Sequence, residues 1–187
     1  VLAGSMKVGV LDNLAGQLQV KNDLTAGQLT NNAEMIVGGN MTTSDALNNA
    51  GSVSVVGSAN ISGSLNQSTA EASFVALGGE NVINAQVNVS EGTFALGSTT
   101  VQSGSVINAT GNSNVSMHLA ADTEMAGRIN VDGTSVRLGA VDAVNPLANA
   151  DAPQYPYSSN LTAAQNPILL GNEGVIAVGS GAAQKDL

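Results

Sequence analysis

The chain of 187 residues contains no cysteine and no tryptophan, and only 2 phenylalanines and 2 tyrosines. The absence of cysteine excludes disulfide bridges and thiolate metal sites. Basic residues are also scarce, because 5 lysines and arginines stand against 14 aspartates and glutamates and give a formal net charge of −9. Such a charge repels the phosphates of nucleic acids and of anionic lipids, so neither partner is expected. No apolar run reaches the roughly eighteen residues that a membrane-spanning helix needs.

Small residues take the place of the missing large ones. The sequence has 22 glycines, and 43% of its residues are hydrophobic while 10% are charged. A chain this apolar is expected to fold rather than to stay disordered. Its length suits one domain or one rod, and its small side chains suit a thin, repetitive core.

An internal repeat covers residues 11–67. Leucines recur at intervals of eighteen, and an asparagine follows each of the first three two places later, at Asn13, Asn31 and Asn49. Continuing the same count gives three more aliphatic residues. We predict that this phase of the repeat forms one buried column, composed of Leu11, Leu29, Leu47, Leu65, Ile83, Val101 and Leu119.

Short strands separated by turns are the predicted secondary structure. Leu18 and Val20, and later Val53 and Val55, alternate with polar residues between clusters of Gly, Asn and Ser, which is typical of strands. Gly or Asn interrupts nearly every window that a helix would need, so a helical repeat is not favoured. Positions six residues apart within the repeat are largely apolar, which indicates a coil with three sides.

The predicted fold is therefore all-β, a three-sided parallel β-helix (β-solenoid) with about 18–19 residues per coil. We expect coils over residues 1–139, with residues 1–10 as a cap strand at the N-terminal end. All four prolines and both tyrosines follow residue 145, and proline interrupts strand ladders. Residues 140–187 are thus predicted to form a loop-rich capping or assembly segment with short terminal strands.

The same C-terminal segment is the predicted contact surface between copies of the chain. Tyrosine is enriched at protein interfaces, and aromatic residues are nearly absent elsewhere in this sequence. A cap packed on its own rod would use the same residues, so both interpretations stay open. The predicted assembly residues are Pro153, Tyr155, Pro156, Tyr157, Ile168, Leu169, Leu170, Val175 and Val178.

The repeated asparagines predict a ladder along the solenoid. Identical amides on coils stacked at about 4.8 Å can hydrogen-bond from one coil to the next and hold the register of the stack. Asn13, Asn31 and Asn49 have the spacing that such a ladder requires. Turn asparagines that face solvent would show the same spacing, so the pattern leaves the direction of their side chains open.

Residues suited to catalysis are few. His118 and Arg137, with Asp122 or Glu124 nearby, form the one group of bases and acids that neighbouring coils could bring together, and a solvated outer face explains them better than a catalytic site does. We therefore expect no catalytic residues. No cofactor is expected either, although carboxylates in the second half leave calcium open: Asp122, Glu124, Asp132, Asp142 and Asp151.

The segments beginning Leu11-Asp-Asn-Leu-Ala-Gly, Leu29-Thr-Asn-Asn-Ala and Leu47-Asn-Asn-Ala-Gly-Ser-Val-Ser-Val resemble the coils of filamentous-haemagglutinin-type adhesins and autotransporter passengers. That resemblance implies a right-handed parallel β-helix exported to the bacterial surface. The three-sided frame is also similar to the cytoskeletal bactofilins, and the Asn- and Gly-rich composition to secreted functional amyloids.

The function expected from these features is structural. We predict a self-assembling, extracellular β-solenoid subunit of a bacterial surface filament, adhesin or surface layer, because each open end of a solenoid presents unpaired backbone groups. Its expected partners are further copies of itself and host or matrix glycans. The alternatives are a carbohydrate-active β-helix enzyme (a polysaccharide lyase or hydrolase) and a cytoskeletal bactofilin-like polymer.

Overall fold

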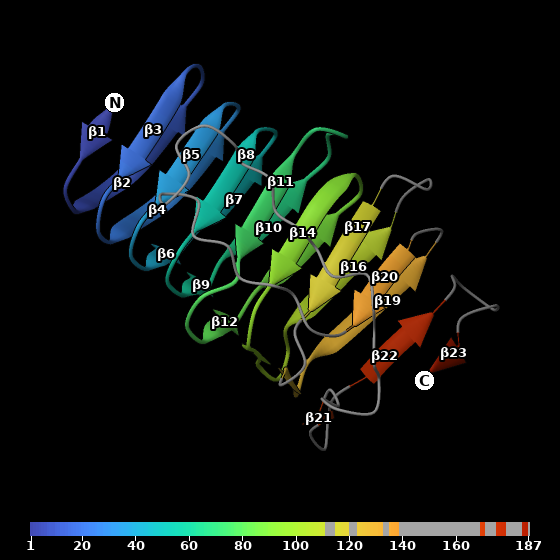
Figure 1. The fold of residues 1–187 in the computed structure, drawn as a ribbon. Coiled ribbons are helices and arrows are strands. Elements are labelled where there is room, and N and C mark those ends of the chain that lie inside the picture. The colour runs from blue at the N-terminus through green and yellow to red at the C-terminus, as the bar shows by residue number, and fades with distance from the viewer. Residues whose placement is uncertain are drawn as a thin grey trace.

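The structure, a computed structural model, describes residues 1–110, 115–119, 123–132, 135–138, 169–170, 175–178 and 185–186. These residues form 23 strands and no helix, and they wind into a β-solenoid of about seven turns (Figure 1). The described residues thus contain no helix that could cross a membrane. The predicted all-β parallel solenoid is confirmed.

The first face of the coil is a parallel sheet of eight strands. Each turn of the solenoid contributes one strand, and Figure 1 shows them side by side along the axis. In spatial order they are β1 (Leu2–Ala3), β3 (Gln17–Val20), β5 (Glu34–Val37), β8 (Ser52–Val55), β11 (Ser73–Ala76), β14 (Gly92–Leu96), β17 (Val115–Leu119) and β20 (Ser135–Leu138).

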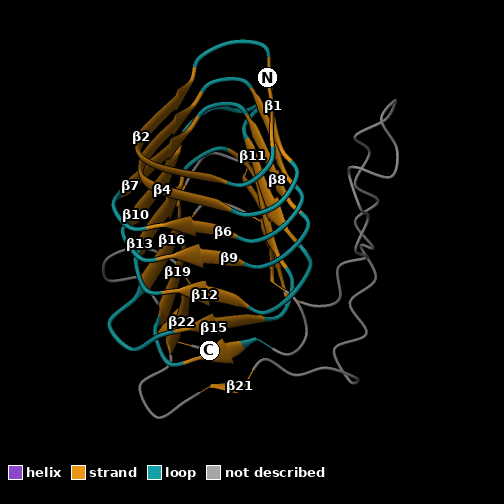
Figure 2. Cartoon of the chain, turned by 90° about the vertical axis from the view of Figure 1, so that its left-hand side faces the viewer, coloured by secondary structure: helices purple, strands orange, loops and turns teal. Residues whose placement is uncertain are grey.

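The other two faces belong to one 15-stranded sheet that bends around a corner. In the first two turns a single eight-residue strand spans both faces, namely β2 (Met6–Asn13) and β4 (Leu24–Asn31). The second face continues with β6 (Met41–Thr43), β9 (Ala59–Ile61), β12 (Asn81–Ile83), β15 (Thr99–Val101), β18 (Glu124–Met125) and β21 (Leu169–Leu170). The third face continues with β7 (Ala46–Asn49), β10 (Ser64–Gln67), β13 (Gln86–Val89), β16 (Val106–Thr110), β19 (Arg128–Asp132) and β22 (Val175–Val178). Figure 2 shows the three faces around the interior.

Both ends of the chain take part in the coils. β1 and the beginning of β2 pair in parallel with β3 and β4, so residues 1–10 form part of the first turn. Near the other end, β21 and β22 pair in parallel with β18 and β19 and complete the last turn. The two-residue strand β23 (Lys185–Asp186) then lies antiparallel to β22.

Alternating side chains build the core. In β5, for example, Met35 and Val37 are buried while Glu34 and Ile36 are partly exposed, as a strand with one face toward the interior requires. One column on the first face contains the two phenylalanines, and the rings of Phe74 and Phe94 stack with centroids 5.6 Å apart. Because a single coil cannot bury these residues, the core exists only through stacking.

The predicted single column of seven aliphatic residues is wrong, because its members lie on three different faces. The four leucines of the repeat do lie opposite one another on the third face. The next residue in that column is Val87 instead of Ile83, since the spacing of equivalent residues changes there from 18 to 22. Ile83 and Val101 belong to the second face, and Leu119 to the first. All seven predicted residues except the half-buried Leu11 are nevertheless buried in the core.

Glycine permits close approach where the chain turns between faces. A Cβ atom on Gly63 would lie 1.7 Å from the carbonyl oxygen of Asp45 in the preceding turn, closer than any side chain can tolerate. Gly92 has a φ of 80°, a backbone conformation that glycine adopts without steric cost. These positions explain why glycine is frequent in a chain of narrow coils.

Candidate functional site

Four buried amides form an inner ladder at the corner between the third and first faces. Asn13 Nδ2 donates to Asn31 Oδ1 over 2.7 Å, and Asn31 Nδ2 donates to Asn49 Oδ1 over 2.9 Å. Asn49 Nδ2 continues the series to Gln67 Oε1 at 3.1 Å. Their exposed fractions are 7%, 0%, 3% and 1% in chain order, so these side chains point into the coil.

The inner ladder also fastens each corner to the strand of the following turn. Asn13 Nδ2 donates to the carbonyl oxygen of Glu34 at 2.9 Å, and Asn49 Nδ2 donates to that of Ser73 at 2.9 Å. Buried amides stabilise a fold only when their hydrogen bonds are satisfied, and here each one bonds both to an amide and to the backbone. The ladder therefore holds the register of the first turns, where the third face passes into the first.

Gln67 is a member that the repeat analysis missed. The turn after Gln67 is longer than the turns after Asn31 and Asn49, since β11 begins only at Ser73. The longer glutamine side chain spans this gap and donates through Nε2 to the carbonyl oxygens of Glu91 and Thr93, each at 3.0 Å. The signal was present, because Gln67 follows Leu65 by the same two places as each asparagine follows its leucine.

A second ladder, which the sequence analysis did not foresee, runs along the outside of the third face. Its rungs are joined by side-chain hydrogen bonds of 3.1, 2.9, 2.9 and 2.7 Å. Asn48 is exposed and the other rungs are half-buried. We call this series the outer amide ladder, and it consists of Asn48, Asn66, Asn88, Asn108 and Asn130.

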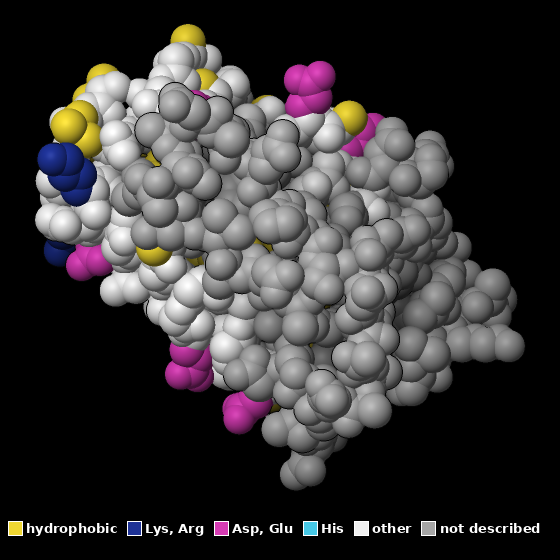
Figure 3. Space-filling model, in the orientation of Figure 1, with side chains coloured by type: hydrophobic (Ala, Val, Ile, Leu, Met, Phe, Trp, Pro, Cys, Tyr) yellow, Lys and Arg dark blue, Asp and Glu magenta, His cyan; other side chains and the backbone are white. Residues whose placement is uncertain are grey.

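The N-terminal end of the solenoid presents an unpaired strand edge. Among the described strands β2 pairs only with β4, so the opposite edge of this eight-residue strand is free. Among the described residues, large exposed apolar side chains occur only in this first turn, at Val1, Leu2, Val10 and Leu14. Figure 3 shows hydrophobic and basic side chains gathered at this end, while acidic side chains are spread over the visible surface.

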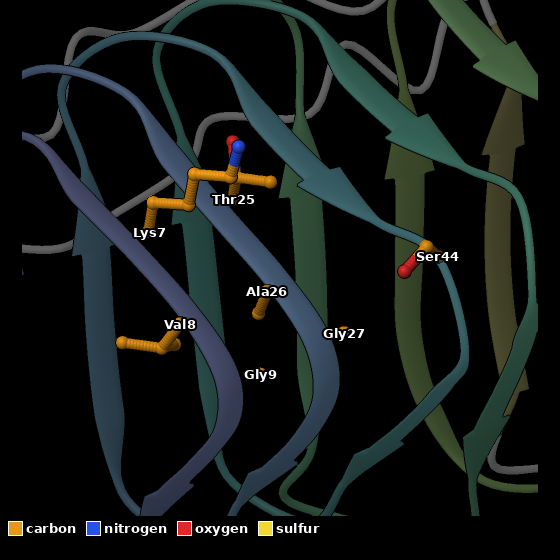
Figure 4. A pocket seen from close by; sticks show the side chains of 7 residues that line it. All are labelled: Lys7, Val8, Gly9, Thr25, Ala26, Gly27 and Ser44. Atoms are coloured by element: carbon orange, nitrogen blue, oxygen red, sulfur yellow. The ribbon is translucent and has the colours of Figure 1, made fainter.

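Gly9 and Asn13 at this end lack contacts that the equivalent residues of later turns make with the preceding turn. A Cβ atom on Gly27 would lie 2.5 Å from the carbonyl oxygen of Gly9 in the preceding turn, whereas a Cβ atom on Gly9 would meet nothing within 4 Å. No described donor reaches Asn13 Oδ1, although the equivalent oxygens of Asn31 and Asn49 each accept a hydrogen bond. Beside Gly9 lies an open hollow of about 560 Å³, shown in Figure 4 and lined by Lys7, Val8, Gly9, Thr25, Ala26, Gly27 and Ser44.

The structure places the predicted C-terminal assembly residues in two groups. Pro153, Tyr155, Pro156, Tyr157 and Ile168 lie outside the described residues. The other four lie on strands that pair within the chain: Leu169 and Leu170 in β21, and Val175 and Val178 in β22. Because β22 lies between β19 and β23, both of its edges are paired, and strand addition by another copy at β22 would require β23 to leave.

The residues considered for catalysis and metal binding are only partly brought together. His118 and Arg137 lie opposite each other on β17 and β20, whereas Asp122 lies outside the described residues. Glu124 is exposed on β18 of the second face. Within the described parts of the chain, no group of three or more His, Cys, Asp or Glu residues could hold a metal ion.

The fold defines the class of this protein as a parallel β-solenoid repeat protein. Comparisons of the chain with protein-family models, with curated proteins and with solved structures give no match. The resemblance to filamentous-haemagglutinin-type adhesins therefore stays a prediction from the repeat alone.

Proposed function

We propose that the protein is a structural, self-assembling β-solenoid subunit of a bacterial surface filament, adhesin or surface layer, and that its first turn is the contact between copies. The observation that carries this proposal is the free edge of β2. An eight-residue strand with one unpaired edge is a ready template for another strand.

The glycine at position 9 supports stacking on this edge. Inside the solenoid, the equivalent Gly27 is needed because the Gly9 carbonyl oxygen of the preceding turn approaches it. Nothing within the described chain approaches Gly9 in the same way. A further turn stacked on β2 would supply the missing carbonyl.

The partner that fits this edge best is the last turn of a second copy. That turn ends with β20 on the first face, β21 on the second and β22 on the third. The first turn of another copy begins with β1 on the first face and continues with β2 over the other two. The faces therefore follow one another in the correct order, and a head-to-tail contact would continue the solenoid as an open filament.

The role that we propose is extracellular and non-enzymatic. The repeat resembles those of exported adhesins, and scarce lysines and arginines offer trypsin-like proteases few cleavage sites. Bases are scarce in the sequence, with 5 lysines and arginines and 1 histidine, whereas a polysaccharide lyase or hydrolase needs several acids and bases along a groove. We therefore rank a structural role above the enzymatic alternative.

The decisive experiment compares the wild-type chain with the Gly9→Ala variant by sedimentation velocity and negative-stain microscopy over a range of concentrations. The wild type should form elongated assemblies. Gly9→Ala should remain monomeric with an unchanged circular dichroism spectrum, because its methyl group has room in the monomer and obstructs only a stacked neighbour.

Asn60→Ala is the matched control, because Asn60 is exposed on the second face away from β2. This variant should assemble like the wild type. A wild-type chain that stays monomeric at every concentration would show that the proposed self-assembly is wrong. Assembly of Gly9→Ala at the wild-type level would show instead that the first turn is not the contact.

A further inference from the structure

We propose that the outer amide ladder is a binding surface for a neutral, hydroxyl-rich polymer, that is, an uncharged polysaccharide chain lying along the solenoid axis. The proposal rests on the third face alone and does not depend on self-assembly. Three properties of this face carry it: the free hydrogen-bonding capacity of the rungs, the lack of charge around them and a polar hollow beside them.

The rungs present a regular row of donors and acceptors. An asparagine amide has two N–H donors and an oxygen with two lone pairs. In the ladder, Asn66 and Asn88 each use one N–H toward the preceding rung and one lone pair toward the following rung. One donor and one acceptor thus remain on Asn66 and on Asn88 for an outside partner, and neighbouring rungs are separated by the strand spacing of about 4.8 Å.

The surroundings of the ladder are uncharged over five turns. Outward positions on the third face alternate with the buried core residues, and from β4 to β16 none of them is ionisable. Charge returns only at the two ends, with Asp12 on β2 and Arg128 on β19. The uncharged outward positions from β4 to β16 are Gln28, Thr30, Ala46, Asn48, Ser64, Asn66, Gln86, Asn88, Val106 and Asn108.

The other two faces lack such a row. The middle positions of the second-face strands are Thr42, Asn60, Val82, Thr100 and Glu124, which mix apolar, polar and acidic groups. On the first face, the position that points away from the core passes from Ser54 to Val75 and Ala95, which carry no amide and are buried. The continuous amide row is therefore a property of the third face among the described residues.

A shallow hollow adjoins the ladder at the corner toward the first face. Its volume is about 100 Å³, and its lining is rich in amides: Asn32, Asn48, Asn49, Ala50, Asn66 and Ser68. None of these groups is charged, so the hollow extends the neutral hydrogen-bonding surface and makes it concave at this corner. A side group of a polymer lying on the ladder could enter it.

The chemistry of this surface selects a hydroxyl-rich ligand. A sugar hydroxyl both donates and accepts hydrogen bonds, so it can satisfy the free N–H and the free lone pair of the same rung. One sugar ring of an extended polysaccharide is close to one strand spacing in length, so successive rings can meet successive rungs. Anionic polymers are disfavoured by the net charge of −9, and an apolar peptide would leave the free amide groups unpaired.

The test measures binding of the whole 187-residue chain to a panel of neutral polysaccharides (cellulose, chitin, β-1,3-glucan and mannan), with heparin and polygalacturonate as anionic probes. Co-sedimentation serves for the insoluble polymers and calorimetry for the soluble ones. Asn88→Asp is the central variant, since it removes both N–H donors of the middle rung and adds a charge there. It should bind the neutral polymer at least about tenfold more weakly than the wild type.

Two further variants make the result interpretable. Asn60→Asp introduces the same change at an exposed position on the second face and should bind like the wild type. Gln86→Arg leaves every ladder hydrogen bond in place and sets a long charged side chain at an exposed position beside Asn88, so it should also weaken binding. It replaces Asn88→Asp as the test if that variant proves unstable.

Several results would overturn the proposal. They are failure of the wild type to bind any neutral polysaccharide of the panel, binding to the anionic probes only, and wild-type binding by both third-face variants. A loss of self-association in Asn88→Asp with polysaccharide binding unchanged would assign the ladder to contacts between copies instead. Gly9→Ala should still bind, so failure of self-assembly and failure of this inference can be told apart.

Discussion

Asn49 Nδ2 donates a hydrogen bond to Gln67 Oε1 over 3.1 Å, and this contact joins the regular turns of the solenoid to the irregular ones. Up to this point the inner amides are spaced by 18 residues. Beyond it, the column continues with Val89, which cannot extend an amide ladder. The glutamine ends the series by bonding to backbone carbonyls, so no buried amide is left unsatisfied there.

The two ladders should differ sharply in what they contribute to stability. Asn31→Ala removes a fully buried amide, takes one acceptor from Asn13 Nδ2 and leaves the buried Asn49 Oδ1 without its donor, so it should lower the free energy of unfolding by about 3 kcal/mol. Asn48→Ala truncates an exposed rung whose remaining partner can bond to water, and it should cost less than about 0.5 kcal/mol. Chemical denaturation of both variants measures the difference, and equal losses would contradict the inner position of the first ladder.

A buried hydroxyl in the core offers a stabilising substitution. Thr43 Oγ1 is the one buried side-chain polar atom that lacks a hydrogen-bond partner among the described residues, and its column is otherwise apolar, with Ala26 and Ile61 on either side. Thr43→Val keeps the shape and removes the unpaired group, so it should raise the free energy of unfolding by about 1 kcal/mol.

Thr99→Val is the matched control for that substitution. Thr99 is equally buried, but its Oγ1 donates to the carbonyl oxygen of Gly97 over 2.7 Å. The control should therefore destabilise the chain by about 1 kcal/mol. If both valine variants shift thermal unfolding in the same direction, hydrogen bonding is not what distinguishes the two threonines.

Much of the fold could be predicted from the sequence, because the alternation of strands and the repeat of leucines both reflect burial. The positions of Leu29 and Leu47 follow directly from a coil that returns to the same face after 18 residues. A fixed count then fails after Gln67, since turn length is not constrained by core packing and may change without disturbing the strands. Ile83 consequently lies on the second face, although it has the right phase for the third.

The outer amide ladder was harder to foresee for the same reason. Its rungs are separated by 18, 22, 20 and 22 residues, so no constant period reveals them. A local signal does exist, because each rung directly follows a buried aliphatic residue, as Asn88 follows Val87 and Asn108 follows Ile107. Aligning the turns on their buried residues, instead of counting from the first leucine, would have brought these asparagines together.

Glycines that face a neighbouring turn should be far less replaceable than those that face open space. Gly63→Ala would place a methyl group against the Asp45 carbonyl and should cost more than about 2 kcal/mol or prevent folding. Gly4→Ala, whose Cβ would meet nothing within 4 Å, should leave the thermal unfolding midpoint nearly unchanged. Circular dichroism melts of the two variants provide the comparison, and a stable Gly63→Ala variant would argue against the close approach of turns at that corner.

Removal of β23 should promote assembly. β23 covers the edge of β22 at two positions only, where Ala177 lies opposite Asp186 and Val178 lies opposite Lys185. A second copy that stacks its eight-residue β2 on the last turn must displace this short strand, so a chain truncated after residue 182 should assemble faster than the full chain in light-scattering measurements.

Adding Gly9→Ala to the truncated chain provides the control. Because Gly9 lies on the opposite end of the solenoid, the added methyl group should abolish the faster assembly without restoring β23. Assembly that is slower after truncation would mean that residues 183–187 contribute to the contact between copies. In that case β23 would be part of the interface that the C-terminal residues were predicted to form, and the head-to-tail contact would have to include it.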